Sequence, residues 1–429
     1  MARQTLSSTL IASIAGIELA RDLGNATGLA FSSDRVKAGD VFFALAGEHS
    51  HGIKYAEQAL ENGAAFIVSD KYHKHGMLVD EPAKLLMDLG HWARAQHSGN
   101  IIAVTGSAGK TSTKNFIAQA LDIPKSPGNF NTPLALAKTL VENLLNQSHA
   151  KDLVLELGID HQGEMDILVD LAKPDYAVLT LISASHLAGL ESIAIVASEK
   201  KKILTNTKLA LVSEDALAYV EKNNKIKTYG LYPKDLDYSS KILKQDINGQ
   251  NLEFRGLEFH LPVLSSAMAK AATAAMALAT ELGYDLAQAA KRLQSVRLEP
   301  RRLEIKRHKD FIILDDSYNS SPAALIEAIK VLKTLPKAHT AILGDMLELG
   351  ANSAQLHKDL AKYLTDIDLI TIGNYSKHFG DLNPNSEHFS NIEQAQAYLT
   401  KFDKSGSILV KASLGMKFID VIDILEAEK

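Results

Sequence analysis

The chain has 429 residues, of which 46% are hydrophobic and 23% charged, and its net charge at pH 7 is −5. This length suggests about three domains of ~150 residues each, and the weak negative charge gives no reason to expect a nucleic acid or an anionic membrane as partner. The absence of cysteine excludes disulfides, thiolate metal sites and thiol nucleophiles.

The first twenty residues are mildly apolar but contain Glu18, which favours a first helix of the fold over a signal peptide. No apolar run in the sequence approaches the ~20 residues that a bilayer span requires. We therefore expect a cytoplasmic protein that is not inserted in a membrane, and we expect it to be a monomer.

The order of predicted elements divides the chain into three α/β units, at 1–82, 83–297 and 298–429. In the first unit, strands at 40–47 and 64–70 flank a helix at 55–63. A helix at 81–98 leads into the second unit. That unit has strands at 101–106, 152–158, 176–182, 209–213 and 225–230, which alternate with helices at 112–121, 164–172, 192–204 and 214–223. A hairpin at 251–261 and an Ala-rich helical pair at 265–294 complete it. A charged linker at 297–310 leads to strands at 311–316, 339–345, 368–373 and 407–410, again with helices between them. This alternation predicts parallel sheets covered by helices on both faces.

The stretch TGSAGKTSTK, residues 105–114, predicts a phosphate-binding loop between a strand and a helix. Gly106 and Gly109 allow the backbone to curl so that its N–H groups and the helix N-terminus face an anion. Lys110 would reach the β- and γ-phosphates, and the Thr111 hydroxyl would bind magnesium. The loop is shorter than the common P-loop, since Val104 stands where that loop has its first glycine. It does not by itself distinguish a kinase, an ATPase and a ligase.

Three further side chains are candidates for the same site. Glu156 ends the next predicted parallel strand, where a carboxylate could bind magnesium opposite Thr111 or could simply cap a helix. His186 follows another strand, and a lone histidine is more often structural. Lys200 would supply charge directly or, if buried and deprotonated, would react with carbon dioxide to form a metal-binding carbamate.

Six stretches resemble the Mur ligases and occur in the order found in that family. They are TGSAGKTSTK, GNFNTPLALAKTL, ELGIDHQGE, SHLAGLESIAIVASEK, DDSYNSSPAAL and LGDMLELG. Further similarities at 36–52 and 408–413 extend the resemblance over nearly the whole chain. The last two of the six stretches are the most specific, and they resemble the branch that acts on D-alanyl-D-alanine.

The resemblance implies an N-terminal UDP-substrate-binding domain, a central P-loop-type ATP-binding domain and a C-terminal Rossmann-like domain. It also implies an ATP- and Mg²⁺-dependent amide ligase of peptidoglycan precursor synthesis, with UDP-N-acetylmuramoyl-tripeptide and D-alanyl-D-alanine as substrates. ATP would convert the terminal carboxylate of the peptide into an acyl phosphate, which the amine then attacks. The third residue of the peptide is left open between lysine and diaminopimelate.

The resemblance also assigns roles to individual residues. Lys110 matches the phosphate-binding lysine, Thr111 and Glu156 match ligands of a first magnesium ion, His186 matches a ligand of a second, and Lys200 matches a carbamylated lysine. The expected nucleotide contacts are Thr105, Gly106, Ser107, Ala108, Gly109, Lys110, Thr111, Ser112, Asn129, Asn131, Arg302, Asp316, Tyr318 and Asn319, with Asp316 on the ribose. The stretch from Gly344 to Gly350 is expected to shape the pocket for the amine substrate.

Several positions depart from the family pattern. Asp34 follows Ser33 where an arginine is expected, with Arg35 as a possible replacement, and Ala38 replaces a proline. Leu264, Ser266 and Ala267 replace a Gly-x-His-Asn motif associated with adenine, and Leu414 replaces an arginine. These differences leave open two alternatives: a divergent ligase with another acid and amine, or an ATP-binding relic without turnover. The retained phosphate-site residues favour the ligase.

Overall fold

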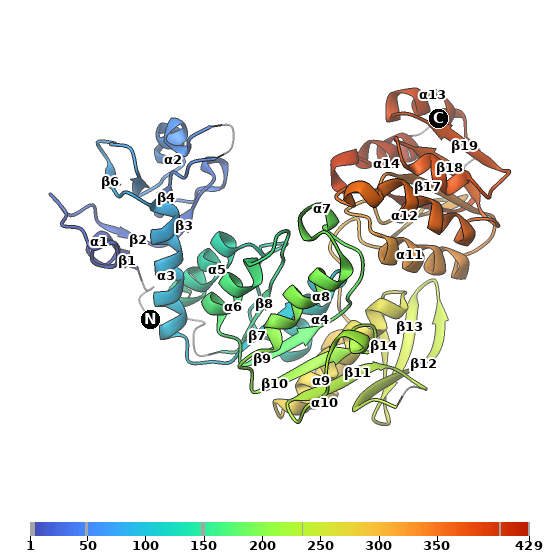
Figure 1. Ribbon diagram of the computed structural model, residues 1–429, viewed down its shortest axis with the longest axis horizontal. Helices are drawn as coiled ribbons and strands as arrows, with labels where there is room; N and C mark the ends of the chain where they lie inside the picture. The colour runs from blue at the N-terminus through green and yellow to red at the C-terminus, as the bar shows by residue number, and fades with distance from the viewer. Residues whose placement is uncertain (1–4, 48–49, 147–150, 234, 403–404, 428–429) are drawn as a thin grey trace.

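The computed structural model describes residues 5–47, 50–146, 151–233, 235–402 and 405–427. Three large sheets follow one another along the chain, from the N-terminal part through the central part to the C-terminal part (Figure 1). The expected architecture of three α/β units is confirmed. Residues 1–4, 48–49, 147–150, 234, 403–404 and 428–429 of the predicted units lie outside the described residues.

The N-terminal part is built on a parallel four-stranded sheet in the order β3-β4-β5-β6. Its elements are β1 (Leu6–Ser7), α1 (Ser8–Ala15), β2 (Asn25–Ala26), β3 (Gly28–Ala30), β4 (Asp40–Phe43), α2 (Ala56–Glu61), β5 (Phe66–Ser69), β6 (Gly76–Leu78) and α3 (Pro82–Gln96). The helix expected in the first twenty residues is therefore α1, which Ser7 caps by accepting a hydrogen bond from the Leu10 N–H. The very short strands β3 and β6 were not predicted.

The central part contains an eight-stranded sheet in the order β14-β13-β12-β11-β10-β9-β7-β8. Strands β7 to β12 are parallel, and β13 and β14 extend the sheet in antiparallel fashion. The strands are β7 (Ile101–Thr105), β8 (Leu153–Glu156), β9 (Tyr176–Leu179), β10 (Leu209–Ser213), β11 (Ile226–Leu231), β12 (Tyr238–Asp246), β13 (Gly249–Phe254) and β14 (Leu257–Leu261). The helices are α4 (Lys110–Leu121), α5 (Pro133–Leu145), α6 (Glu164–Ala172), α7 (Leu187–Leu190), α8 (Ile193–Lys201), α9 (Ser266–Glu281) and α10 (Leu286–Leu293).

Helices cover both faces of the central sheet, as expected. Successive residues of β7 alternate between two hydrophobic cores, with Ala103 in the core shared with α3, α5 and α6, and Val104 in the core shared with α4, α9 and α10. The first of these cores continues into the N-terminal sheet, where it includes Val41 and Phe43. The loops at the carboxyl ends of β7, β8 and β9 are thereby fixed against a rigid support.

The prediction of a helix at 214–223 is wrong. The chain there makes a turn and then a single 3₁₀ turn at Leu217–Tyr219. The Ser213 hydroxyl accepts a hydrogen bond from the Asp215 N–H, and the Ser213 carbonyl accepts one from the Ala216 N–H. A serine that bonds the nearby backbone in this way favours a turn over a helix. Helix α5 and strand β12 were not predicted.

The C-terminal part contains a six-stranded sheet in the order β15-β16-β20-β17-β18-β19, parallel except for β15. Its elements are β15 (Glu304–Arg307), β16 (Phe311–Asp315), α11 (Pro322–Thr334), β17 (His339–Gly344), α12 (Ser353–Leu360), β18 (Asp368–Ile372), β19 (Ser386–Phe389), α13 (Ile392–Lys401), β20 (Gly406–Lys411) and α14 (Ile419–Glu426). The charged segment predicted as a linker thus already contains a strand, whose Ile305 packs on the core beside α11 and α12. Across the described ranges, no helix combines the length and apolar character that a membrane span needs.

Candidate active site

The phosphate loop lies between β7 and α4, as predicted, and its two glycines are required by the backbone. Gly106 has φ +156° and Gly109 has φ +80°, and a Cβ atom at Gly106 would lie 1.9 Å from Oγ1 of Thr180. The Thr180 hydroxyl donates to the Ala108 carbonyl at 2.7 Å, while Ser107 exchanges hydrogen bonds with the backbone of Ser183. The end of β9 therefore holds the loop in its curled form.

The ammonium group of Lys110 bends back over the loop and donates a hydrogen bond to the Gly106 carbonyl at 2.9 Å. Burial lowers the pKa of Lys110, and the carboxylates of Glu156 and Asp160 oppose this effect while Arg302 adds to it. Thr111 and Ser112 are buried in the first turn of α4. Arg302, from the C-terminal part, thus lies within electrostatic range of Lys110.

Glu156 ends β8 with its side chain buried, at the carboxyl edge of the sheet where it was expected. Its Oε1 accepts a hydrogen bond from the Asn131 amide at 3.1 Å. Its Oε2 has no hydrogen-bond partner but lies 3.2 Å from Nζ of Lys114, whose side chain is also buried. Asn129 is exposed two residues before Asn131.

Lys200 is a fully buried lysine on α8 whose Nζ has no hydrogen-bond partner. Burial lowers its pKa well below the ordinary range, and the charge of Lys110 lowers it further while Asp160 opposes the shift. Burial thus favours the neutral, nucleophilic form of this amine more than in a lysine exposed to water.

His186 stands at the start of α7 in the left-handed conformation, with φ +51°. Its Nδ1 lies 2.8 Å from Oδ1 of Asp160 and 3.0 Å from Oε2 of Glu348, which belongs to the C-terminal part. Hydrogen bonds to these two carboxylates raise the pKa of His186 above its ordinary value. The Ala188 N–H also donates to the Glu348 carbonyl at 3.3 Å.

The LGDMLELG stretch after β17 fixes Glu348 through a set of local contacts. The buried carboxylate of Asp345 accepts hydrogen bonds from the backbone N–H groups of Asn374, Tyr375 and Ser376. The N–H of Met346 donates to Nε2 of His357. A side chain that pairs with His186 is thus carried on a well-anchored loop.

Arg302 and Asp316 come together at the end of β16. The Arg302 guanidinium lies 4.1 Å from the centre of the Tyr318 ring. Asp316 accepts hydrogen bonds from the Leu303 N–H at 3.0 Å and from Nζ of Lys411 at 2.6 Å, while the Asn319 carbonyl accepts a further one from Lys411. Burial raises the pKa of Asp316, and Lys411 opposes this shift. Both carboxylate oxygens of Asp316 thus have protein partners.

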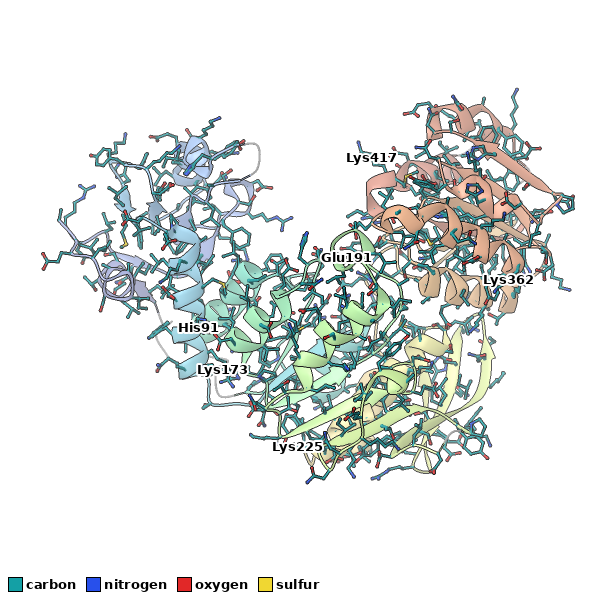
Figure 2. The ribbon with its side chains drawn as sticks, in the orientation of Figure 1. His91, Lys173, Glu191, Lys225, Lys362 and Lys417 are labelled. Carbon is teal, nitrogen blue, oxygen red and sulfur yellow. The ribbon has the colours of Figure 1, made fainter. Side chains whose placement is uncertain are left out.

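A mainly apolar cavity of about 260 Å³ lies between the central and C-terminal parts, close to the contact between His186 and Glu348. It is lined by Ala184, Leu187, Glu191, Ser192, Ile193, Asn352, Gln355 and Leu356. Figure 2 shows Glu191 beside α7, at the tip of the central part that reaches toward the C-terminal part.

Four features of the site were not predicted from the sequence: Lys114, Asp160, Lys411 and the specific role of Glu348. Lys114 lies one helical turn after Lys110 in the stretch TGSAGKTSTK. This i,i+4 spacing places both lysines on one face of α4. The spacing could therefore have identified Lys114. Asp160 and Glu348 meet only through His186, so a single sequence holds no local signal for their pairing. Among the described residues, no group of three or more His, Asp or Glu side chains is arranged to hold a metal ion by itself.

Three sequence models of one family match successive parts of the chain. They describe the Mur ligase family catalytic domain at residues 25–120, the Mur ligase middle domain at 104–279 and the Mur ligase glutamate ligase domain at 301–414. A UDP-N-acetylmuramoyl-tripeptide–D-alanyl-D-alanine ligase of Rickettsia prowazekii (strain Madrid E) is 30% identical, over 95% of this chain and 97% of that ligase. The chain belongs to the Mur ligase family.

Solved structures of Mur ligases share the fold of this one. MurF from Acinetobacter baumannii superposes with a TM-score of 0.86, at 23% sequence identity and over 100% of both chains. MurF from Thermotoga maritima, solved in complex with ADP, superposes with a TM-score of 0.77 at 24% identity, over 93% of this chain and 97% of that one. The Mur ligases are ATP-dependent ligases, so this chain is an enzyme of that class.

Some of the positions that depart from the family pattern, such as Asp34 and Leu264, have identifiable contacts in this Mur ligase. The Ser33 hydroxyl donates to Oε1 of Gln58 at 2.8 Å, and the Ser32 hydroxyl donates to Asp34. Leu414 is 50% exposed. Leu264 is buried and packs in the core of the C-terminal part, although it belongs to the central chain segment.

Proposed function

We propose that this Mur ligase joins D-alanyl-D-alanine to UDP-N-acetylmuramoyl-tripeptide with consumption of ATP, in peptidoglycan precursor synthesis. The observation that carries the proposal is the nearly full-length similarity to ligases of that name. The arrangement of Lys110, Glu156, His186 and Lys200 around one sheet edge supports it. The proposal includes a monomeric enzyme acting in the cytoplasm.

The proposed reaction has two steps. The γ-phosphoryl group passes from ATP to an oxygen of the peptide carboxylate, which gives ADP and an acyl phosphate. The amine nitrogen of the dipeptide then attacks the carbonyl carbon, the bond from that carbon to the phosphate oxygen breaks, and phosphate leaves while the amine loses a proton. This route requires no nucleophile from the protein, in agreement with a chain that has no cysteine.

Positioning and charge stabilisation are the proposed contributions of the protein. The N–H groups of the loop from Gly106 to Thr111 and the N-terminus of α4 would hold the phosphates. Lys110, which folds over the loop, would neutralise charge on the transferred phosphoryl group. Arg302 and Asp316 would contact the nucleotide from the C-terminal side.

The residues at Glu156 fit a magnesium ion. Glu156 offers a buried oxygen, Oε2, that has no hydrogen-bond partner and lies 3.2 Å from Nζ of Lys114, and the Thr111 hydroxyl would supply a second oxygen ligand. Such a site, with few protein ligands completed by phosphate oxygens and water, suits Mg²⁺. When bound, the ion neutralises charge on the phosphate oxygens.

Lys200 fits the proposed carbamylation. Its neutral amine nitrogen would attack the carbon of carbon dioxide, one C=O electron pair would move to oxygen, and the nitrogen would release a proton. The carboxylate so formed, together with Nε2 of His186, would supply ligands for a second metal ion. The absence of a hydrogen-bond partner for Lys200 Nζ supports this modification.

The apolar cavity between α7 and α12 is the proposed site for the methyl groups of D-alanyl-D-alanine. Leu187, Ile193 and Leu356 give it apolar walls, as small aliphatic side chains require. The adjoining loop with Glu348 belongs to the stretch from Gly344 to Gly350, which the family resemblance predicted to shape the pocket for the amine substrate.

Release of ADP by the purified protein tests the proposal. With ATP and Mg²⁺ present, we expect release to require both UDP-N-acetylmuramoyl-tripeptide and D-alanyl-D-alanine, with one amide product formed per ADP. The absence of ADP release with both substrates, from folded protein that still binds ATP, would contradict it. Activity with another acid or amine would identify a divergent ligase, and ATP binding without any turnover would identify a relic.

A further inference from the structure

The opening of helix α9 makes an unusual contact with the C-terminal part of the molecule. Glu327 on α11 accepts hydrogen bonds from the hydroxyl of Ser265 at 2.7 Å and from the hydroxyl of Ser266 at 2.9 Å. Its Oε1 also accepts one from the N–H of Ala267 at 3.1 Å. A carboxylate from one part of the molecule thus binds the N-terminus of a helix in another, where the helix dipole favours negative charge.

Neighbouring contacts show that this is a continuous interface. Leu264, directly before the serines, packs in the hydrophobic core formed by α11 and α12. Arg307, at the end of β15, contacts the turn between β12 and β13. Its guanidinium group donates to the Ile247 carbonyl at 3.2 Å and to the Asn248 side chain at 2.9 Å. Like those of Arg307, the contacts of Glu327 combine a charge with several hydrogen bonds, which makes them more directional than the apolar packing of Leu264.

The position of Glu327 on α11 gives the contact a functional consequence. Helix α11 follows the segment with Asp316 and Tyr318, and Arg302 packs on Tyr318. Holding α11 against α9 therefore fixes the angle at which these nucleotide-facing residues approach the phosphate loop. Without that contact, the central and C-terminal sheets would still be connected by the linker, by Leu264 and Arg307, and by the contacts of Glu348 with His186 and Ala188.

We propose that Glu327 is a positioning residue that clamps the C-terminal part onto α9 and so keeps the ATP site assembled. Ser265 and Ser266 are its partners, at the point where the chain lacks the Gly-x-His-Asn motif of the family. Glu327 acts through the orientation of Arg302 and Asp316. Loss of the clamp lowers the fraction of molecules in the binding-competent orientation, and the apparent affinity for ATP falls by that same fraction.

Spin labels can measure the orientation directly, because the chain has no cysteine of its own. Lys225→Cys and Lys362→Cys place one label on the central part and one on the C-terminal part, both at exposed positions (Figure 2). With Glu327 intact we expect one narrow distance distribution between the labels. We expect Glu327→Ala to broaden it, and Glu327→Gln, which keeps an oxygen acceptor but loses the charge, to give an intermediate width.

Calorimetry with a non-hydrolysable ATP analogue gives the second measurement. We expect Glu327→Ala to weaken binding on the order of tenfold, as a fall of the competent fraction to about one tenth requires. In the ligase assay, KM for ATP should rise while kcat at saturating ATP changes little, because bound ATP itself restores the orientation. The calorimetry and the label distances do not depend on the acid and amine substrates, so they test this inference even if the proposed function fails.

Two matched variants separate the clamp from a general loss of stability. Lys333→Ala removes an ion pair on the same helix, to Asp366, that lies within the C-terminal part, and it should leave both measurements unchanged. Ser266→Ala removes a partner of Glu327, and the double variant with Glu327→Ala should be no worse than Glu327→Ala alone. An unchanged distance distribution with ATP affinity within about twofold of the wild type, or fully additive effects of the two substitutions, would overturn the proposal.

Discussion

The ammonium nitrogen of Lys114 lies 3.2 Å from Oε2 of Glu156, and both side chains are at most 2% exposed. The carboxylate expected at the magnesium site is therefore already paired with a buried cation from the helix that follows the phosphate loop. Because Asn131 binds the other oxygen of Glu156, the carboxylate is held in one orientation before any ligand arrives. The pairing makes the stability of this region depend on Lys114.

We predict that Lys114→Met destabilises the central part by about 3–5 kcal/mol, the usual effect of leaving one member of a buried ion pair uncompensated. Urea unfolding followed by the fluorescence of Trp92, which packs on the core shared by the N-terminal and central parts, measures the change. The double variant Lys114→Met/Glu156→Gln should recover part of the loss, since it removes the unpaired charge. Equal stability of the single and double variants would show that the charge of Glu156 is not what Lys114 offsets.

The phosphate loop could be predicted from sequence because all of its determinants are local. Gly106 and Gly109 need their conformations within one turn, and Lys110 and Thr111 follow directly on the helix. The strand order that brings Glu156 beside the loop follows from the general rule that parallel strands end at one edge of a sheet. Local signals of this kind were sufficient for the α/β architecture as well.

Contacts between distant segments could not be predicted in the same way. Glu327 meets Ser265, and Glu348 meets His186, only because the C-terminal sheet packs beside the central one. Nothing in the residues near Glu348 indicates which histidine it will face. The wrong helix at 214–223 has a different cause: an apolar pattern typical of a helix was overridden by the hydrogen bonds of Ser213 with the backbone of its turn.

The buried amine of Lys200 leads to a second prediction. Lys200→Ala and Lys200→Arg should both lose nearly all ligase activity, because neither can form the carbamate. Short carboxylic acids should partly restore the Ala variant and leave the Arg variant inactive, since arginine fills the space. Carbon-13 NMR with labelled carbon dioxide should show a carbamate signal in the wild type that the variants lack.

The neighbouring Lys201→Ala serves as the control for Lys200, because Lys201 is not among the expected site residues. It should keep both the activity and the carbamate signal. Full activity of Lys200→Ala or Lys200→Arg would refute the role assigned to this side chain.

The contact between His186 and Glu348 predicts a measurable change in the pKa of the histidine. In metal-free protein, Glu348→Gln should lower the pKa of His186 toward its ordinary value, because one of the two carboxylates that stabilise the protonated ring is removed. Proton NMR of the imidazole across pH measures the shift. Glu191→Gln, on an exposed side chain at the end of α7, should leave this pKa unchanged; an equal shift in that variant would mean that long-range charge, and not the contact, sets it.

His357 should make the stability of the C-terminal part depend on pH. Its Nδ1–H donates to the Ser353 carbonyl at 2.6 Å while its Nε2 accepts the N–H of Met346 at 3.0 Å, so the folded state requires a neutral ring. Burial lowers the pKa of His357, the charge of His378 lowers it further, and the Ser353 carbonyl and Asp345 oppose the shift. The folded pKa thus lies below the unfolded value of about 6.5.

With this sign, the contribution of His357 is fully present above about pH 6.5 and is lost as the pH falls through the lowered folded pKa. In urea unfolding, the stability difference between the wild type and His357→Gln should shrink from pH 7.5 to pH 5.5, with a slope of at most about 1.4 kcal/mol per pH unit for one proton. Because both proteins contain His186, its contribution to the pH dependence of the unfolding free energy cancels when the difference is taken at each pH. A difference that stays constant over this range would show that the folded state accepts a protonated His357, and that the hydrogen bond from Met346 does not hold the loop of Glu348 in place.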